Sequence, residues 1–221
     1  MGGFNIDDAL RYAGVRFPTA EDISAMARRG EKIREAAPAR YVYRVFSLKD
    51  TEDGPQLSEA GLTLPGELAK QMLTGCQRAA LIVCTLGAAF DFLLRAQEKR
   101  DMAEALLLDG CGSAAVEAGC DEAEREIAAR FPGMYLTDRF SPGYGDLPLT
   151  LQPQILTALN AEKRLGVHAA PSCLLMPVKT VTALVGIASS PRPARIRGCD
   201  HCALRENCAL RKGGNGCGLE K

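Results

Sequence analysis

The chain has 221 residues, 47% of them hydrophobic, and its 27 basic and 27 acidic residues give a formal net charge of zero. This length and composition allow one sizeable core, so we expect one domain with a short appendage. The charge balance excludes bulk nucleic-acid binding and membrane-surface binding. The longest apolar run, residues 79–90, is too short to span a bilayer, and the N-terminus lacks a basic signal region. We therefore expect a cytoplasmic protein.

Hydrophobic residues spaced three and four apart predict several helices. In chain order these are residues 6–14, 20–36, a segment that begins near Pro65, a segment that follows Gly87, 101–130 and 151–160. Segments rich in β-branched and aromatic residues, or continuously apolar, predict strands at 41–46, 62–64, 80–85, 172–176 and 180–187. Residues 50–58 are polar and are expected to form a loop. The last strand alternates between an apolar face and a mixed face. We predict an α+β fold, a twisted antiparallel sheet flanked by helices.

The turn at Leu86-Gly87 joins a predicted strand directly to a helix. A glycine in such a turn can leave backbone N–H groups free for a ligand, as phosphate-binding loops do. Steric clearance for a neighbouring group is the simpler explanation, and we favour it.

The segment 139–146, with the sequence RFSPGYGD, combines groups that suit a small-ligand pocket. Arg139 offers a planar fork of donors for a carboxylate or phosphate. Pro142 and Gly143 favour a tight turn in which the backbone can approach a ligand closely. Tyr144 adds an apolar ring with a hydroxyl group at its tip. The alternative interpretation is a surface turn with a solvated arginine.

The long helical pattern of residues 101–130 is interrupted by small residues at 110–115. Glycines inside a helix cost about 1 kcal/mol each relative to alanine, so this face is expected to pack closely against something. Glu117 lies on that face, four residues after Ser113 and seven after Gly110. It is a candidate partner for a ligand ammonium group, and the alternative is a solvated glutamate.

Nine cysteines fall into two groups. Five lie singly in apolar surroundings and are expected in the core: Cys76, Cys84, Cys111, Cys120 and Cys173. The other four follow a linker at 189–193 and are candidate metal ligands: Cys199, Cys202, Cys208 and Cys217. The first pair has the Cys-x2-Cys spacing that presents two thiolates to one zinc ion or iron–sulfur cluster, and His201 could replace one thiolate. The remaining spacings match no standard pattern, so a loose cysteine-bearing tail is the alternative. We therefore divide the chain into a domain of residues 1–190 and a Cys-rich tail of residues 191–221.

Five motifs together resemble the activation domain of cobalamin-dependent methionine synthase in its free-standing form. They are the Arg-x-x-x-Gly-Tyr pattern at Arg139, Gly143 and Tyr144, and the segments TLG at 85–87, DGCGSAAVE at 109–117, EKRLGV at 162–167 and LMPVKTVTA at 175–183. The resemblance covers roughly residues 5–190. It implies a domain that binds S-adenosylmethionine and docks on a cobalamin-binding domain, where inactive cob(II)alamin is reductively remethylated.

The resemblance also implies roles for the candidate residues. Arg139 would pair with the carboxylate of S-adenosylmethionine, Glu117 with its ammonium group, and the Gly143 backbone would lie close to the ligand. Tyr144 would face the corrin ring and act in the methyl transfer. The chain would then be an accessory domain of a methyltransferase in methionine biosynthesis, and the cobalamin would be carried by a partner, since the chain has no Asp-x-His-x-x-Gly loop.

Reductive activation needs an electron from outside the chain. Residues 191–221 hold seven Lys or Arg residues and three acidic residues, a net charge of +4, which could attract an acidic carrier such as a flavodoxin or ferredoxin. Two alternatives stay open on the sequence alone. The chain could reactivate another corrinoid protein, or it could be a metal-dependent interaction module without ligand chemistry.

Overall fold

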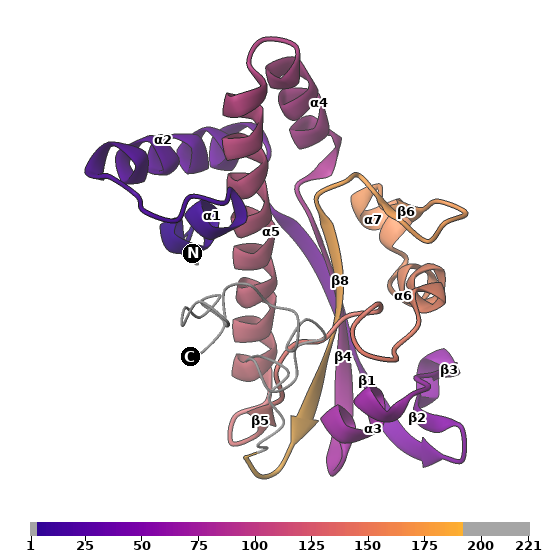
Figure 1. The fold of residues 1–221 in the computed structure, drawn as a ribbon. Helices are drawn as coiled ribbons and strands as arrows, with labels where there is room; N and C mark the ends of the chain where they lie inside the picture. Colours follow the sequence, from indigo (N-terminus) through magenta and orange to yellow (C-terminus); the bar gives the residue numbers. More distant parts are fainter. Residues whose placement is uncertain (1–3, 192–221) are drawn as a thin grey trace. The chain divides into compact units, whose positions relative to one another are not determined.

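The computed structural model describes residues 4–191, which form seven α-helices and eight strands (Figure 1). The helices are α1 (Ile6–Tyr12), α2 (Ala20–Ala36), α3 (Glu67–Leu73), α4 (Gly87–Glu98), α5 (Met102–Arg130), α6 (Gln152–Leu159) and α7 (Ala161–Leu165). The strands are β1 (Arg40–Thr51), β2 (Gly54–Leu57), β3 (Leu62–Thr63), β4 (Cys76–Thr85), β5 (Tyr135–Leu136), β6 (His168–Ala169), β7 (Leu175–Met176) and β8 (Thr180–Ala188). Two short 3-10 helices lie at Ser58–Ala60 and Leu149–Leu151.

The strands confirm the predicted α+β fold. Six of them form an antiparallel sheet in the order β3-β2-β1-β4-β8-β5, and β6 pairs with β7 separately. The described chain divides into two compact units. The first unit consists of residues 4–44, 81–130 and 150–182, and the second of residues 45–80, 131–149 and 183–191. Three long strands, β1, β4 and β8, contribute residues to both. The predicted boundary between residues 190 and 191 stays a prediction.

Helix α2 begins and ends where the sequence predicts, at Ala20 and Ala36. Thr19 and Asp22 explain the start, because they form a reciprocal capping box. The Asp22 backbone N–H donates to the Thr19 hydroxyl at 3.2 Å, and the Thr19 N–H donates to the Asp22 carboxylate at 2.8 Å. Two of the free N–H groups at this end of the helix are thereby satisfied.

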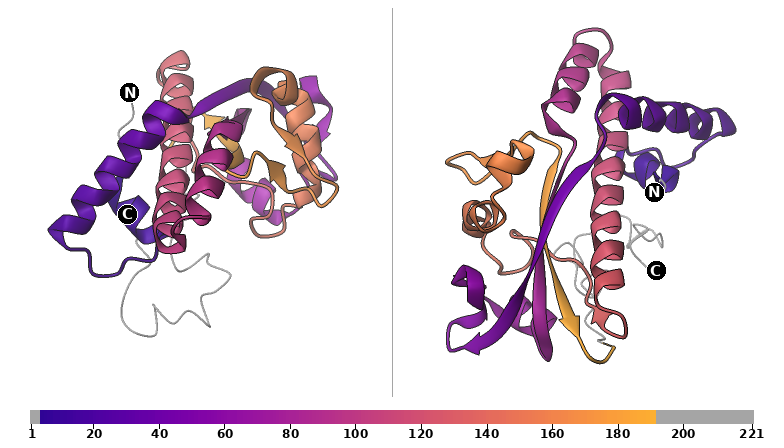
Figure 2. Two further views of the ribbon diagram at one scale, coloured as in Figure 1. Left: turned by 90° about the horizontal axis from the view of Figure 1, so that it is seen from above. Right: turned by 180° about the vertical axis from the view of Figure 1, so that it is seen from behind.

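Helix α5 is continuous through its small residues, which let neighbouring helices of the first unit approach it. A Cβ atom on Gly110 would lie 2.7 Å from the Ala13 nitrogen beside α1, and one on Gly112 would lie 2.3 Å from the Phe90 ring of α4. Helix α5 packs against α1, α2 and α4, as Figure 2 shows. The predicted close packing is confirmed, and the elements that pack against these small residues are helices of the same protein.

The strand predicted at 172–176 was wrong in extent, since only Leu175–Met176 forms a strand, and the loop predicted at 50–58 was also wrong. Strand β1 continues to Thr51 and β2 begins at Gly54, and these two residues face each other in an antiparallel hairpin. The Thr51 hydroxyl donates to the Gly54 carbonyl at 2.6 Å and closes the turn. In β8 the predicted mixed face is also buried, since Thr182 is only 2% exposed. A strand covered on both faces need not alternate in polarity.

Candidate functional site

Segment 139–146 lies in the second unit and continues from β5 along strand β8. Phe140 and Leu184 exchange backbone hydrogen bonds of 3.1 and 2.7 Å. Before them, the Thr137 N–H donates to the Gly186 carbonyl at 3.0 Å, and the Gly186 N–H donates to the Thr137 hydroxyl at 2.8 Å. The backbone of Arg139 is therefore held between two anchored residues, and the Phe140 ring is fully buried.

Arg139 is itself buried, with 8% of its surface exposed, and no other charged residue in the described part of the chain is buried to this degree. Water cannot solvate such a guanidinium, so its charge must be met by hydrogen bonding within the site. The alternative prediction of a solvated surface arginine is therefore wrong. Its pairing with a ligand carboxylate stays a prediction.

The turn after Arg139 has the geometry that its sequence predicts. Ser141 and Tyr144 close a β-turn, in which the Tyr144 N–H donates to the Ser141 carbonyl at 3.0 Å. Pro142 occupies the first central position and Gly143 the second, with a φ of +95° that other residues rarely adopt. This pattern is typical of a type II turn. Tyr144 emerges from it with 51% of its surface exposed, so its ring is available to a ligand or partner.

Asp146, at the end of this segment, caps a helix distant in sequence. Its carboxylate accepts hydrogen bonds from the backbone N–H groups of Glu67, at 2.6 Å, and Leu68, at 3.0 Å, at the start of α3. The hydrogen bonds from Leu68 and Glu67 hold the pKa of Asp146 below its usual range, because they stabilise the ionised form. No sequence pattern around Asp146 singled it out.

Glu117 lies on α5 in the first unit and is partly buried. Burial raises the pKa of Tyr12 on α1, and the negative charge of Glu117 raises it further, so the two side chains lie near each other. The α5 face that carries Gly110 is thus occupied by α1. Arg139, Gly143 and Tyr144 belong to one segment of the second unit, whereas Glu117 belongs to the other unit. Its pairing with a ligand ammonium stays a prediction.

Segments from three of the other motifs meet at Lys179 in the first unit. Its ammonium group lies 2.9 Å from both an Asp109 carboxylate oxygen and the Ser113 hydroxyl. Its backbone carbonyl accepts from the Leu86 N–H at 3.0 Å and from the Thr85 hydroxyl at 3.3 Å. Lys179 therefore ties the turn before β8 to both α5 and the end of β4.

The turn at Leu86-Gly87 uses its N–H groups within the protein. The Leu86 N–H donates to the Lys179 backbone carbonyl, and the Gly87 N–H donates to the Thr85 hydroxyl at 3.0 Å. A Cβ atom on Gly87 would lie 3.2 Å from the Arg40 guanidinium, which in turn donates to the Leu165 carbonyl. Gly87 also has a φ of +73°, a backbone conformation that favours glycine whatever the space beside it, so the steric interpretation stays a prediction.

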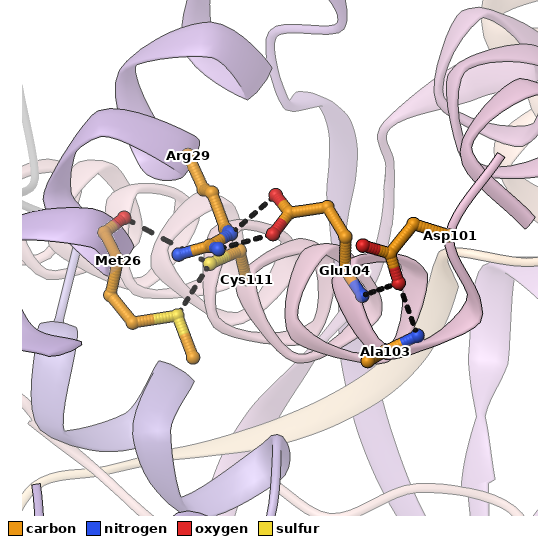
Figure 3. Close-up of polar contacts among 6 residues, drawn as sticks. All are labelled: Met26, Arg29, Asp101, Ala103, Glu104 and Cys111. Atoms are coloured by element: carbon orange, nitrogen blue, oxygen red, sulfur yellow. Dashed lines mark hydrogen bonds and ion pairs between the residues drawn. The ribbon is translucent and has the colours of Figure 1, made fainter.

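A cavity of about 200 Å³ lies in the first unit, and its lining includes none of the residues predicted to bind a ligand. It is lined by Ala25, Arg28, Arg29 and Lys32 of α2 and by Glu104 of α5. Arg29 forms a two-pronged ion pair with Glu104 (Figure 3). The Glu104 N–H donates to Asp101, which caps α5. Positive and negative groups thus share this cavity, and its ion pair joins α2 to α5.

Cys111 packs behind this ion pair (Figure 3). Its sulfur lies 3.3 Å from the Met26 sulfur, and the residue is fully buried, as are Cys84 and Cys120. The prediction of core cysteines is confirmed for these three. Cys76 and Cys173 are only partly buried, so for them it was wrong. Cys173 has a φ of +65° and lies in a turn.

The buried thiol predicts a loss of stability in alkali. Burial raises the pKa of Cys111 from 9.0 to about 11. As the pH rises, the thiol therefore ionises in the unfolded chain before it ionises in the native protein. The contribution of Cys111 to the free energy of unfolding is complete below pH 9 and is lost as the pH rises through 11. We expect the urea-measured stability of the wild type, relative to Cys111→Ala, to fall by about 1 kcal/mol between pH 8 and 10. A constant difference between the two proteins would contradict this assignment.

Two further expectations concern metals and membranes. Within residues 4–191, no group of three or more His, Cys, Asp or Glu residues is arranged to hold a metal ion. The candidate ligands Cys199, Cys202, Cys208 and Cys217 lie outside the described residues, so the metal site of the tail stays a prediction. None of the helices between residues 4 and 191 combines the length and apolar character needed to cross a membrane.

Comparisons with known proteins agree with the fold. No protein-family model and no curated protein matches the chain. Among solved structures, the chain matches the crystal structure of the MetH reactivation domain bound to AdoHcy, with a TM-score of 0.62 and 16% sequence identity. The match covers 90% of this chain and 76% of the other. The resemblance expected from the motifs is therefore confirmed at the level of the fold.

Proposed function

We propose that this protein binds S-adenosylmethionine and presents it to a cobalamin carried by another protein, supporting reductive remethylation of cob(II)alamin. The main support is the shared fold with a reactivation domain that holds AdoHcy, the form of the ligand left after methyl transfer. At 16% sequence identity this similarity supports only a shared fold, so the proposed chemistry must be argued from the residues of the candidate site.

The second unit offers groups that fit the amino-acid end of such a ligand. The buried guanidinium of Arg139 suits a carboxylate, because two parallel hydrogen bonds and opposite charges combine in one contact. In this proposal the Gly143 backbone also lies close to the ligand, although the space in which a Cβ atom of Gly143 would lie is bordered by the Leu149 side chain, at 3.1 Å.

Catalysis by this chain would consist of positioning. The bound sulfonium supplies an electrophilic methyl group, and the reduced cobalamin of the partner supplies the electron pair, so no general base is needed. Arg139 would fix the ligand, and the exposed Tyr144 ring would contact the corrin face of the partner. The methyl–sulfur bond would break as the electron pair of the cobalt forms a bond to the methyl carbon, and the electrons of the broken bond would remain on sulfur.

The partners follow from this chemistry and are part of the proposal. A cobalamin-carrying methionine synthase subunit would dock over Tyr144, and a flavodoxin or ferredoxin would supply the electron. The same chemistry would serve another corrinoid protein equally well. The choice between these partners depends on which corrinoid protein the chain binds.

Isothermal titration of the purified wild-type protein with S-adenosylmethionine and with S-adenosylhomocysteine tests the proposal. We expect saturable binding of both ligands at one site, because they share the carboxylate, ammonium and adenosine groups. Adenosine alone is the control, and it should bind at least about tenfold more weakly because it lacks the charged end. Absence of saturable binding for either charged ligand would refute the proposal.

A further inference from the structure

Helix α3 lacks a capping side chain of its own. The residue before its first turn is Gly66, which has a φ of +102° and no side chain to accept a hydrogen bond. The first N–H groups of a helix need acceptors, and an uncapped end usually costs stability. Here the acceptor is Asp146, whose carboxylate binds the N–H groups of Glu67 and Leu68.

The start of α3 is shaped around this carboxylate. A Cβ atom on Gly66 would lie 2.6 Å from an Asp146 oxygen, so a side chain at position 66 would displace the carboxylate. Gly145 packs beside it, where a Cβ atom would lie 3.3 Å from the Leu68 side chain. The nearby charges on α3 are Lys70, which favours the ionised Asp146, and Glu67, whose side chain pairs with Lys70 at 3.0 Å.

Asp146 also lies inside the turn that carries Tyr144. The Leu147 N–H donates to the Tyr144 carbonyl at 3.0 Å, and the Gly143 N–H donates to the Leu147 carbonyl at 2.7 Å. These bonds close a small loop between residues 143 and 147. The loop is held at one side by the pairing of Phe140 with β8, and at the other by the bonds from Asp146 to α3.

We propose that Asp146 is a positioning residue for Tyr144, and that its bonds to the start of α3 hold the Gly143-Tyr144 backbone in its ligand-binding conformation. This inference rests on the proposed function, in which Gly143 and Tyr144 contact S-adenosylmethionine and the partner. Because the apparent dissociation constant rises as the competent conformation becomes less populated, loss of the anchor should weaken binding.

The test compares calorimetric affinities for S-adenosylmethionine at a temperature where every variant is folded. Asp146→Ala removes both acceptor atoms and should raise the dissociation constant about fivefold, as expected when a typical N-cap contribution is lost from the competent state. Asp146→Asn keeps one carbonyl oxygen as an acceptor and should restore part of the affinity. Thr19→Ala is the matched control, because it removes a helix N-cap in the other unit, and it should leave the affinity unchanged.

The outcomes separate the two ideas. If the wild-type protein does not bind the ligand, the proposed function is refuted, and this inference fails with it. If the wild type binds, and both Asp146→Ala and Asp146→Asn bind the ligand as tightly as the wild type, only the role of Asp146 is refuted. If Thr19→Ala weakens binding as much as Asp146→Ala, the effect reflects general destabilisation, which also refutes it. If Asp146→Ala does not fold, the affinity of Asp146→Asn decides: weaker binding than the wild type supports the role of Asp146, and wild-type affinity refutes it.

Discussion

Replacing Arg139 by alanine should raise the dissociation constant for S-adenosylmethionine by at least about tenfold, because a charge-assisted pair contributes about 1.5–3 kcal/mol. Arg139 is 8% exposed, so its guanidinium has already lost most of its water in the native protein. Isothermal titration of the variant at constant ionic strength measures the effect.

Two further variants separate ligand recognition from protein stability. Arg139→Lys keeps the charge and loses the two-pronged geometry, so its affinity should lie between those of the wild type and Arg139→Ala. Arg28→Ala removes an exposed arginine of the other unit and should leave the affinity unchanged. Urea denaturation must show that Arg139→Ala is folded at the assay temperature. Wild-type affinity in a folded Arg139→Ala protein would refute the role of Arg139.

Local signals in the sequence explain the parts of the fold that could be predicted. Helix α2 carries its own start signal, because Thr19 and Asp22 cap each other across one turn. The turn of segment 139–146 was equally predictable, because Pro142 and Gly143 impose their own backbone conformations. In both cases the interacting residues are at most a few positions apart, so the pattern is visible without knowledge of the fold.

The parts that could not be predicted depend on partners far apart in the chain. The β1–β2 hairpin was missed because its turn-side residues are polar, and Gly54 and Pro55 are buried there only through tertiary packing. Asp146 caps a helix almost 80 residues earlier in the sequence, and Lys179 binds Asp109 across a similar separation. Local periodicity carries no information about such pairs. The one available hint was Gly66, a glycine near the start of the helix predicted from about Pro65, where no capping side chain was evident.

The core of the first unit predicts a large effect for Phe90→Ala. The Phe90 ring is fully buried against the backbone of Gly112, in the space that a side chain at 112 would occupy. Glycine has no side chain with which to fill the space left by the ring, so we expect a loss of about 3–5 kcal/mol in the free energy of unfolding. Phe92→Ala, which changes a residue on the same helix that is 69% exposed, should change stability by less than about 0.5 kcal/mol.

The same contact predicts that one substitution will change sign with its background. In the wild type, Gly112→Ala places a methyl group 2.3 Å from the Phe90 ring, and this overpacking should cost about 1–3 kcal/mol. In the Phe90→Ala background the methyl group enters the vacated space, and alanine favours the helix by about 1 kcal/mol over glycine, so the substitution should stabilise the protein. Urea denaturation of the four proteins measures both effects. If Gly112→Ala changes the free energy of unfolding in the same direction in both backgrounds, the Phe90 ring is not the reason for a glycine at position 112.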